Sequence, residues 1–505
     1  MKIKFNYLFI LPFMLLSCKK GLQQPGTALA VKTAQSMALS VAGIPAFFGN
    51  GADISYLPQM EAAGMVFRSR VNGQQENCLQ ILKEQGINAI RLRAWVNPAH
   101  GYYGTPYVVA LAVRAKAMGF HILIDLHYSD TWADNTHQVK PAAWASDTFA
   151  QLLTDVYNYT YHVMDTLKSV GVTPDWVQVG NEINEGMLLP SGSTSNYSNL
   201  AQLINQGYSA VKAVSPTTQV IIHIAGGENN SAAQTFFDGL TANSANFDII
   251  GFSYYPVYDH ELYNQLDPSL STTLNNMVSR YSKHVMVVET GMPWTDSLNT
   301  FNGLNDCINS VSTVSGANGL GVFYWEPEAY YSYNHISSNA FDTITKAPTH
   351  AMDAFLYNPA NNLVNNFDFE SGGVQKSTIT GWSLWSDNNY DAIYTETGGY
   401  TRSYRLTHWK NTAYQASTYQ DLTGIANGTY MLTAWVQNGG GQTTCEMYAK
   451  GSGAEIDLPL PVTSGWKQIT IKGISVTSGT IAIGFRSVAN AGNWCSFDNV
   501  HLQLQ

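Results

Sequence analysis

Charged residues are scarce in this chain of 505 residues. Asp, Glu, Lys and Arg make up only 12% of it, and the formal net charge is −10. That share is about half of what is usual in globular proteins. No cluster of Lys and Arg forms a basic patch, so nucleic acid is a poor candidate partner. Aromatic side chains are abundant instead, with 12 Trp and 29 Tyr. A surface poor in charge and rich in aromatic, hydroxyl and amide groups is typical of extracellular proteins that handle sugars.

Cysteine is also scarce, and its spacing excludes the common metal sites. Apart from Cys18 near the N-terminus, the chain has Cys78, Cys307, Cys445 and Cys495, and none of them shows metal-ligand spacing. We therefore expect no metal centre. Cys445 and Cys495 fall in the same C-terminal region and are the pair that could form a disulfide in an exported protein. Two free buried thiols are the alternative.

The N-terminal apolar run is too short to span a bilayer. Lys2 and Lys4 precede the run Leu8–Leu16, which is the pattern of an export signal. Leu15-Leu-Ser-Cys18 resembles a bacterial lipobox, in which the cysteine is lipidated. We expect residues 1–18 to be a lipoprotein signal peptide and residues 19–45 to be a tether. The exported protein would then be held by Cys18 at the outer membrane, on the cell surface. An ordinary secretory signal is the alternative.

Residues 46–357 alternate between apolar, strand-like runs and segments with helical spacing such as Tyr107–Met118 and Thr148–Ser169. The predicted strands are Phe48–Ile54, Ala89–Trp95, His121–His127, Trp176–Glu182, Gln219–Ala225, Asp248–Tyr254, His284–Glu289 and Gly319–Glu326. No glycine-rich dinucleotide fingerprint follows the first strand, which argues against a doubly wound open sheet. The pattern predicts an α/β domain of the (β/α)8 TIM-barrel type.

Helical periodicity is lost in residues 361–505. Short alternating runs such as Gly428–Val436 and Trp466–Lys472 are separated by Gly, Asn, Ser and Thr. This pattern predicts a second, all-β domain, a sandwich of jelly-roll type.

Two glutamates, Glu182 and Glu289, stand at the ends of the fourth and seventh predicted strands. Carboxylates are costly to bury, and in a TIM barrel the carboxyl ends of the strands carry the chemistry. Two carboxylates that face each other can cleave a glycosidic bond. We predict that Glu182 is the general acid, with its pKa raised by the barrel wall, and that Glu289 is the nucleophile. Glu185 is a rival acid, and Glu326 is a rival nucleophile.

Arg91 lies on the second predicted strand, in Ile90-Arg-Leu-Arg93. A buried arginine needs an anion. We expect Arg91 to hold the carboxylate of Glu289 ionised through charge-assisted hydrogen bonds. A structural ion pair with Asp53 or Asp125 is the alternative.

Further polar and aromatic residues follow the predicted strands and would bind a sugar. Hydroxyl-binding groups and aromatic faces for pyranose rings are both present among them. Of Tyr254 and Tyr255, alternation along the strand lets only one point inward. The predicted substrate-binding residues are Arg91, His127, Asp130, Trp132, Asn181, Tyr254, Tyr255 and Trp325.

Four motifs carry a family resemblance: Asn88–Pro98, Asp125–Asp134, Gly180–Gly186 and Phe323–Pro327. Together, and in this order, they resemble glycoside hydrolase family 53, whose members are endo-β-1,4-galactanases acting on type I arabinogalactan. The resemblance implies a (β/α)8 barrel, a retaining mechanism and a β-1,4-galactan substrate. It also implies that no cofactor is required.

The resemblance also implies roles for individual residues. Glu182 matches the acid/base and Glu289 the nucleophile, whereas Trp132 matches a sugar-stacking position. Arg91, Asn181 and Trp325 match other active-site positions. Some bacterial relatives bind calcium in an acidic loop after the seventh strand. The corresponding stretch here, Gly291–Asn299, lacks the run of Asp, so the sequence does not support calcium.

The C-terminal domain is similar, more loosely, to carbohydrate-binding modules. Trp409 and Arg405 are its predicted sugar-binding residues, and a purely structural sandwich is the alternative. We expect a monomer that meets a membrane only through its lipid anchor. The rival functions are another retaining endo-glycanase, acting on mannan or xylan, a non-catalytic glycan-binding protein, and a structural lipoprotein.

Overall fold

The computed structural model describes residues 47–504 except 71, 257–267, 335, 357–361, 388–389 and 401–402. The predicted signal peptide, including Cys18, and the whole predicted tether (residues 19–45) lie outside the described residues. In the part of the chain that is described, no helix is both long enough and apolar enough to cross a membrane.

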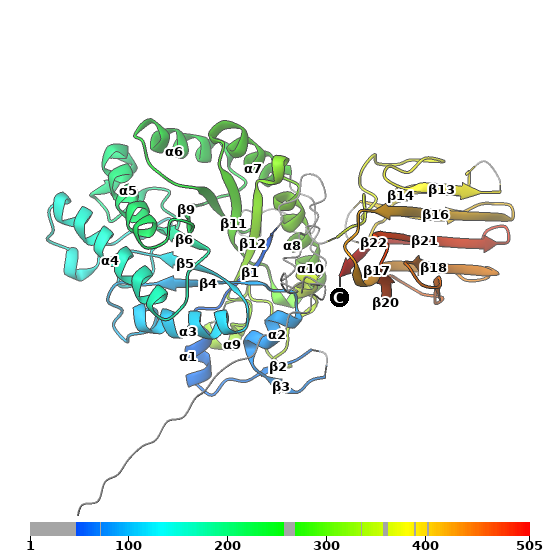
Figure 1. Cartoon of the computed structure of the whole chain (residues 1–505), viewed down its shortest axis with the longest axis horizontal. Coiled ribbons are helices and arrows are strands. Elements are labelled where there is room, and N and C mark those ends of the chain that lie inside the picture. Colours follow the sequence, from blue (N-terminus) through cyan, green and yellow to red (C-terminus); the bar gives the residue numbers. More distant parts are fainter. Residues whose placement is uncertain are drawn as a thin grey trace, which may run out of the picture. The chain divides into compact units, whose positions relative to one another are not determined.

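Eight parallel strands close into a barrel, as the sequence predicts (Figure 1). Their order around the barrel is β1-β12-β11-β10-β9-β6-β5-β4. The strands are β1 (Gly49–Asp53), β4 (Ala89–Ala94), β5 (His121–Leu126), β6 (Trp176–Val179), β9 (Gln219–Ala225), β10 (Ile249–Tyr254), β11 (His284–Thr290) and β12 (Gly319–Trp325). The connections also carry two short strand pairs, β2 (Phe67–Arg68) with β3 (Gln75–Glu76) and β7 (Gly186–Met187) with β8 (Gly192–Ser193).

Helices follow the barrel strands and surround them (Figure 1). Helix α4 begins with a capping box, in which Thr148 accepts from the N–H of Gln151 and the Gln151 side chain accepts in return. The helices are α1 (Leu57–Ala62), α2 (Cys78–Glu84), α3 (Thr105–Ala117), α4 (Phe149–Ser169), α5 (Tyr197–Val214), α6 (Asn230–Ala242), α7 (Pro268–Tyr281), α8 (Ser297–Ser312), α9 (Tyr331–Asn334) and α10 (Asp353–Leu356). Short 3-10 turns cover Ala142–Trp144, Thr194–Asn196, Trp294–Asp296, Ser315–Ala317 and His350–Met352.

The barrel is filled by its own side chains and is not a pore. Leu123, Trp176, Met286 and Phe323 belong to a buried cluster contributed by the barrel strands. Gly51 on β1 makes room for one of them, because a Cβ atom at this position would lie 2.0 Å from the Phe323 ring. A larger apolar layer lies between the strands and the helices.

Strand β6 ends earlier than predicted. The sequence predicts a strand over Trp176–Glu182, whereas the ladder stops at Val179. Gly180 has a φ of 90° and Glu182 a φ of 45°, so the backbone leaves the extended region before the glutamate. A non-glycine residue with positive φ is costly and occurs often at functional sites. This turn places the Glu182 carboxyl group at the barrel rim.

The second domain consists of two five-stranded antiparallel sheets, as predicted (Figure 1). Their orders are β13-β16-β21-β18-β19 and β14-β15-β22-β17-β20. The strands are β13 (Ser383–Ser386), β14 (Ile393–Thr397), β15 (Tyr404–Trp409), β16 (Tyr414–Thr423), β17 (Gly428–Asn438), β18 (Thr444–Lys450), β19 (Ile456–Pro459), β20 (Lys467–Val476), β21 (Thr480–Ala489) and β22 (Trp494–Leu504).

A single apolar core lies between the two sheets and includes Leu432, Phe485 and Phe497. Cys495 is buried in this core, and its thiol is in hydrogen-bond contact with Cys445. Both cysteines are free thiols in this structure, as are Cys78 and Cys307.

Candidate active site

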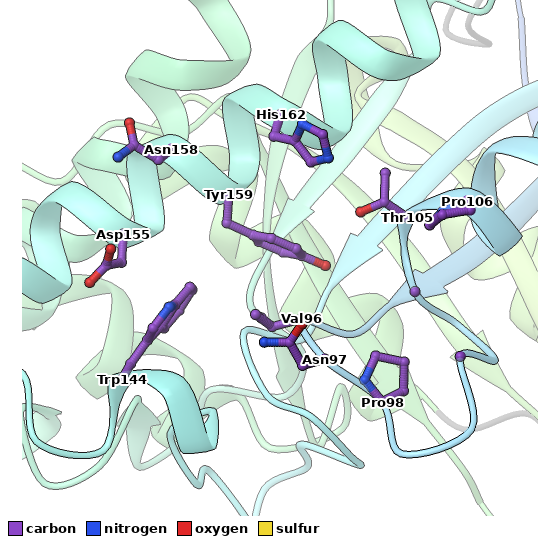
Figure 2. A pocket seen from close by; sticks show the side chains of 12 residues that line it. Val96, Asn97, Pro98, Thr105, Pro106, Trp144, Asp155, Asn158, Tyr159 and His162 are labelled. Carbon is purple, nitrogen blue, oxygen red and sulfur yellow. The ribbon is translucent and has the colours of Figure 1, made fainter.

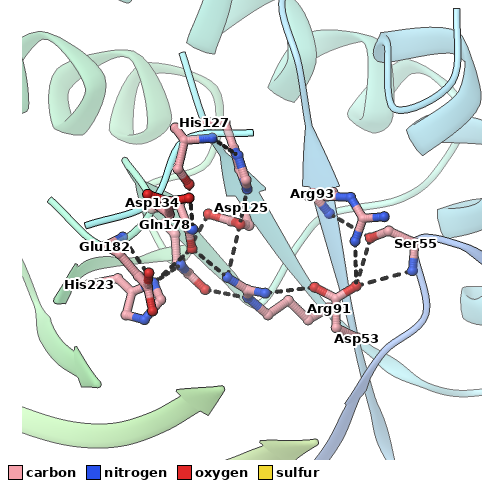
Figure 3. A network of polar contacts seen from close by, with 12 residues as sticks. Asp53, Ser55, Arg91, Arg93, Asp125, His127, Asp134, Gln178, Glu182 and His223 are labelled. Carbon is pink, nitrogen blue, oxygen red and sulfur yellow. Dashed lines mark hydrogen bonds and ion pairs between the residues drawn. The ribbon is translucent and has the colours of Figure 1, made fainter. Parts of the chain in front are cut away.

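Arg91 is the centre of the polar network at the carboxyl ends of the barrel strands (Figure 3). Its side chain is 1% exposed and bridges several strands. The sequence left open whether Arg91 binds Glu289 or a structural aspartate, and the structure shows both. The guanidinium contacts Asp53 Oδ2 at 2.6 Å, Asp125 Oδ2 at 2.9 Å, Asn181 Oδ1 at 2.9 Å, Gln178 Oε1 at 2.7 Å and Glu289 Oε1 at 2.6 Å.

Glu289, on β11, is held between a cation and a phenol. Its Oε1 pairs with Arg91, and its Oε2 accepts a hydrogen bond of 3.2 Å from the Tyr255 hydroxyl. Burial raises the pKa of the Glu289 carboxyl, the charge of Arg91 lowers it, and the charge of Glu182 raises it. A guanidinium does not give up its proton. Contact with Arg91 therefore favours the ionised form of Glu289 over that of Glu182.

Among the described residues, no arginine forms an ion pair with Glu182, which is held by neutral groups. Its Oε1 accepts from the Ser253 hydroxyl at 2.5 Å, and its Oε2 accepts from the Asn135 N–H at 3.3 Å. Burial raises the pKa of Glu182, and the Ser253 hydrogen bond opposes this rise. Two interacting carboxyl groups titrate as a pair. The proton of this pair belongs on Glu182, because Arg91 is in direct contact with Glu289, whereas the contacts of Glu182 in the described part of the chain are with Ser253 and the Asn135 N–H.

His223 contacts both Ser253 and the backbone of Glu182 and helps to hold them in place. The ring is fully buried in the middle of β9, and burial lowers its pKa well below the usual value, so it is neutral. Its Nε2 lies 2.8 Å from Ser253 Oγ, and its Nδ1 accepts from the backbone N–H of Glu182 at 3.4 Å. Because the Ser253 hydroxyl donates its proton to Glu182, we assign the ring proton to Nε2, which can then donate to Ser253, although Nδ1 also lies 2.9 Å from the Asn181 Oδ1 acceptor. His223 then donates to Ser253, and Ser253 donates to Glu182. Sequence reasoning missed both residues, although a histidine inside an apolar strand was a signal that could have found one of them.

A second arginine, Arg93, binds Glu326 instead of the catalytic pair. Glu326 is fully buried, pairs with Arg93, and accepts from the Tyr56 N–H at 3.1 Å. Glu326 is thus bound by Arg93 and a backbone N–H group. These contacts indicate a structural role and argue against Glu326 as the nucleophile.

Arg93 also organises the aromatic residues of the site. Its guanidinium carbon lies over the rings of Tyr56 at 4.4 Å, Tyr103 at 4.2 Å and Trp132 at 4.4 Å. Trp132 in turn lies 6.2 Å from Trp325, measured between ring centroids. The structure therefore brings together the two tryptophans that the sequence predicts to contact sugar.

The two neighbouring tyrosines that the sequence predicts to bind substrate, Tyr254 and Tyr255, lie in different environments. Tyr255 contacts Glu289, whereas Tyr254 belongs to the apolar layer between strands and helices, so the prediction that Tyr254 faces the substrate is wrong. The side chain of Tyr254 points outward because Ser253, one residue earlier, points toward Glu182.

His127 and Asp130 are occupied by loop contacts. His127 Nε2 contacts Asp125 Oδ2 at 2.8 Å, and its Nδ1 accepts from the Ala133 N–H at 3.1 Å. The carboxylate of Asp130 accepts from the backbone N–H groups of Asn97 and Ala142, both at 2.8 Å. These two side chains shape the loop that carries Trp132, and direct contact with sugar stays a prediction.

Among the hollows of the barrel domain, two lie at the loops that follow the barrel strands, and one of these two adjoins Glu182. The larger, of about 770 Å³, lies between the loop after β4 and helix α4, among Trp144, Tyr159 and His162 (Figure 2). Its lining includes neither glutamate of the pair. The other, of about 490 Å³, is lined by Glu182 together with Asn135, Asn184, Glu228, Ser253 and Tyr255. Within the described residues, no group of three or more His, Cys, Asp or Glu side chains could hold a metal ion.

The barrel matches a known family and known relatives. The sequence profile of "Glycosyl hydrolase family 53" matches residues 49–371. A protein of Aspergillus terreus named "Probable arabinogalactan endo-beta-1,4-galactanase A" is 40% identical over 299 residues, which are 55% of this chain and 84% of that protein. The "Arabinogalactan endo-beta-1,4-galactanase" of Humicola insolens is 38% identical over 315 residues, covering 58% of this chain and 93% of that protein.

A solved structure agrees with these matches. The "Ignisphaera aggregans GH53 catalytic domain" superimposes with a TM-score of 0.58 at 31% identity and covers 63% of this chain and 97% of that one. The paired carboxyl groups at the mouth of a closed barrel and the match over residues 49–371 lead to one assignment. This chain is a glycoside hydrolase and belongs to glycosyl hydrolase family 53.

Proposed function

We propose that this protein hydrolyses β-1,4-galactosidic linkages within type I arabinogalactan. The observation that carries the proposal is the unequal pairing of the two glutamates: Glu289 contacts Arg91 at 2.6 Å, whereas the partners of Glu182 among the described residues are neutral donors. One carboxylate and one carboxylic acid are what a retaining glycosidase requires. The galactan substrate is supported by the relatives from Aspergillus terreus and Humicola insolens, both of which are named as arabinogalactan endo-beta-1,4-galactanases.

In the first step, a carboxylate oxygen of Glu289 attacks C1 of the galactosyl unit. Glu182 gives its proton to the glycosidic oxygen as the C1–O bond breaks, so the leaving chain departs with a free hydroxyl group. The product is a galactosyl ester of Glu289. Arg91 and the Tyr255 hydroxyl contact Glu289 and hold the nucleophile in position.

In the second step, Glu182 acts as a base. It takes a proton from water, and the resulting oxygen attacks C1 and releases Glu289 as a carboxylate. Each step inverts C1, so the overall result is retention. The Ser253 hydroxyl donates to Glu182 and therefore stabilises the ionised form between the two steps.

Trp132, Trp325 and Asn181 are the proposed sugar contacts. The two tryptophan rings lie 6.2 Å apart and offer apolar faces to pyranose rings. The amide oxygen of Asn181 accepts from Arg91 and its nitrogen donates to the Ala133 carbonyl, so the group is fixed beside the carboxyl pair.

Digestion of galactan, mannan and xylan in parallel, with chromatographic sizing of the products, tests this proposal. We expect galactan alone to fall rapidly to a range of oligosaccharides, as endo cleavage requires. Rapid cleavage of mannan or xylan would instead favour another retaining barrel enzyme. If none of the three is cleaved while galactan still binds, the chain is a non-catalytic glycan-binding protein.

The sandwich is proposed to bind sugar through Arg405 and Trp409 on β15. Trp409 is 40% exposed, and Arg405 is fixed by Glu396 at 3.0 Å and Gln437 at 2.8 Å. Together with Tyr394, Thr407 and Trp494, these side chains surround a hollow of about 300 Å³. A Trp409→Ala variant that keeps the galactan affinity of the parent would refute this site.

The lipid anchor, the cell-surface location and the monomeric state are proposed on the sequence alone. Cys18 follows the lipobox-like Leu15-Leu-Ser. Fractionation of cells that produce the parent or Cys18→Ala tests the anchor. We expect the parent in the membrane fraction and the variant outside it, and an unchanged distribution would contradict the proposal. Size-exclusion chromatography with light scattering tests the monomer.

A further inference from the structure

The outward face of the sheet β13-β16-β21-β18-β19 carries a group of aromatic and charged side chains. Met447 and Phe485 belong to the core between the sheets. Because side chains alternate along a strand, their neighbours Tyr448 and Arg486 point to the opposite, outward face. This sheet is not the one that holds Arg405 and Trp409.

The strand register arranges these side chains in two adjacent rows. In the first row, Trp385 pairs with Ser417, Ser417 with Arg486, and Arg486 with Glu446. Arg486 and Trp385 thus flank the small side chain of Ser417, which leaves a low point between them.

In the second row, Tyr419 pairs with Gly484 and Gly484 pairs with Tyr448. A Cβ atom at Gly484 would lie 2.8 Å from the Tyr419 Cβ and 2.8 Å from the Tyr448 hydroxyl. Any other residue would therefore press against both tyrosines. The two rows together form a trough, and the hollow above this sheet, lined by Trp385, Ser417, Tyr419, Tyr448 and Arg486 among others, has a volume of about 540 Å³.

Arg486 is fixed in place along the trough. Its guanidinium lies 4.1 Å from the centroid of the Tyr448 ring, and it contacts Glu446 at 3.2 Å and Glu455 at 2.8 Å. The side chain still keeps 36% of its surface exposed. Glu446 and Glu455 orient the Arg486 guanidinium without covering it. Its exposed N–H groups can therefore donate hydrogen bonds to an oxygen-rich ligand.

Trp385 is the exposed aromatic group of the trough. It is 51% exposed on the edge strand β13, among the most exposed of the large apolar side chains in the described residues. An exposed tryptophan beside a hollow that also holds a charged side chain is typical of a binding surface.

The chemistry of the trough fits a sugar chain. A galactopyranose ring has an axial 4-hydroxyl, so one of its faces presents a continuous patch of C–H groups that can cover an indole. Its remaining hydroxyls both donate and accept. Arg486 supplies donors, whereas Glu455 and Asp421 at the edges of the hollow supply acceptors.

We propose that this trough is a second carbohydrate-binding site, which takes a β-1,4-galactan chain with one galactosyl ring on Trp385 and hydroxyl groups on Arg486. The identity of the ligand rests on the proposed function of the barrel. With the site at Trp409 on the other sheet, the module would have two separate binding faces. Each domain of this kind could then hold two galactan chains, or two parts of one.

The test uses the full chain carrying Glu289→Gln, so that galactan is not consumed. Trp385→Ala and Arg486→Gln are compared with this parent by retardation in gels that contain soluble β-1,4-galactan. Val462→Ala, at a side chain that is 72% exposed outside the trough lining, is the matched surface control. Thermal unfolding shows that each variant is folded. In chains that keep Glu289, hydrolysis of a short galacto-oligosaccharide is measured as well.

We expect Trp385→Ala to weaken galactan binding about tenfold, Arg486→Gln to weaken it less, and Val462→Ala to leave it unchanged. Hydrolysis of the short substrate should stay the same in all three. Parental affinity in both Trp385→Ala and Arg486→Gln would overturn the proposal, as would a parent that galactan gels do not retard. These outcomes differ from a failure of the proposed function of the barrel. In that case, the chain that keeps Glu289 would not cleave galactan at all.

Discussion

The hydroxyl oxygen of Ser253 lies 2.5 Å from Oε1 of Glu182 and 2.8 Å from Nε2 of His223. The neutral histidine orients the serine, and the serine directs its proton at the carboxyl group. The pKa of Glu182, the proposed acid/base, is thus set by two opposing influences, since burial raises it and this hydrogen bond lowers it.

Replacing Ser253 by Ala should move the alkaline limb of the kcat/KM profile to higher pH. The hydrogen bond stabilises ionised Glu182, so its loss raises the pKa of that group. Because the first step needs protonated Glu182, activity should persist to higher pH while turnover falls. Hydrolysis of galactan across a pH series measures the limb. Ser231→Ala, at an exposed position of α6, is the control and should leave the profile unchanged. An alkaline limb that stays in place, or moves down, contradicts the role of Ser253.

Glu182→Gln should remove the alkaline limb and keep the acid limb. Glutamine resembles the protonated acid but does not titrate, and Glu289 keeps its contact with Arg91. An aryl galactoside with a good leaving group needs no protonation, so the first step can still be followed by stopped-flow release of the phenol. A persisting alkaline limb in this variant would show that another group is the acid.

Arg91→Met should destabilise the fold by about 3–5 kcal/mol, because removing one partner leaves buried charges unpaired. It should also abolish measurable hydrolysis. Urea unfolding followed by fluorescence measures the first effect. Arg114→Met is the control, since Arg114 pairs with Glu61 on the partly exposed surface and should cost much less. Equal losses in the two variants would contradict the account.

Arg91→Met should also reverse the contribution of Asp125 to the pH dependence of the free energy of unfolding. Asp125 has a pKa lowered to about 2, with burial opposing the shift and Arg91 and His127 producing it. In the parent, this group therefore contributes stability above its unfolded pKa of about 3.9, and the contribution is lost as the pH falls toward about 2. Without Arg91, burial should dominate and raise the pKa. The free energy of unfolding of Arg91→Met should then decline as the pH rises above about 4.

Gly51→Ala tests the packing inside the barrel. The added Cβ atom would lie 2.0 Å from the Phe323 ring, so we expect a loss of about 1–3 kcal/mol. Combining it with Phe323→Leu should recover part of the loss, because the smaller side chain leaves room. Gly453→Ala, where no heavy atom lies within 4 Å of the added atom, serves as the control. A Gly51→Ala variant as stable as the parent would refute the close contact.

The barrel and the ends of its strands could be predicted because buried parallel strands appear as apolar runs. The position of Glu289 at the end of a barrel strand was predicted in this way and is confirmed, whereas its catalytic role stays a prediction. Glu182 was predicted to end a strand, but the backbone turns out of the strand before reaching it, at Gly180. The side-chain contacts between neighbouring strands could not be predicted from the sequence, because they depend on the register of the strands. The bulge between Phe252 and Ser253 is one example, and it precedes the choice between Tyr254 and Tyr255.

Asp130 and Glu326 show the other limit of sequence reasoning. Both are carboxylates near strand ends, and a sequence does not show which backbone N–H groups or cations will face them. Asp130 accepts hydrogen bonds from two backbone N–H groups in loops. Glu326 pairs with Arg93 and accepts from the Tyr56 N–H. Such partners come from distant parts of the chain, so their effect becomes visible only once the barrel has closed.

The most direct test of the central claim is to trap the intermediate. The enzyme is incubated with a 2-deoxy-2-fluoro-galactoside that carries an activated leaving group, digested with protease, and analysed by tandem mass spectrometry. We predict a single fluorogalactosyl adduct on the carboxyl group of Glu289, slow reactivation by galactan oligosaccharides, and no adduct on Glu326. Labelling of a different carboxylate, or full turnover of galactan by Glu289→Gln, would contradict the assignment of Glu289 as the nucleophile.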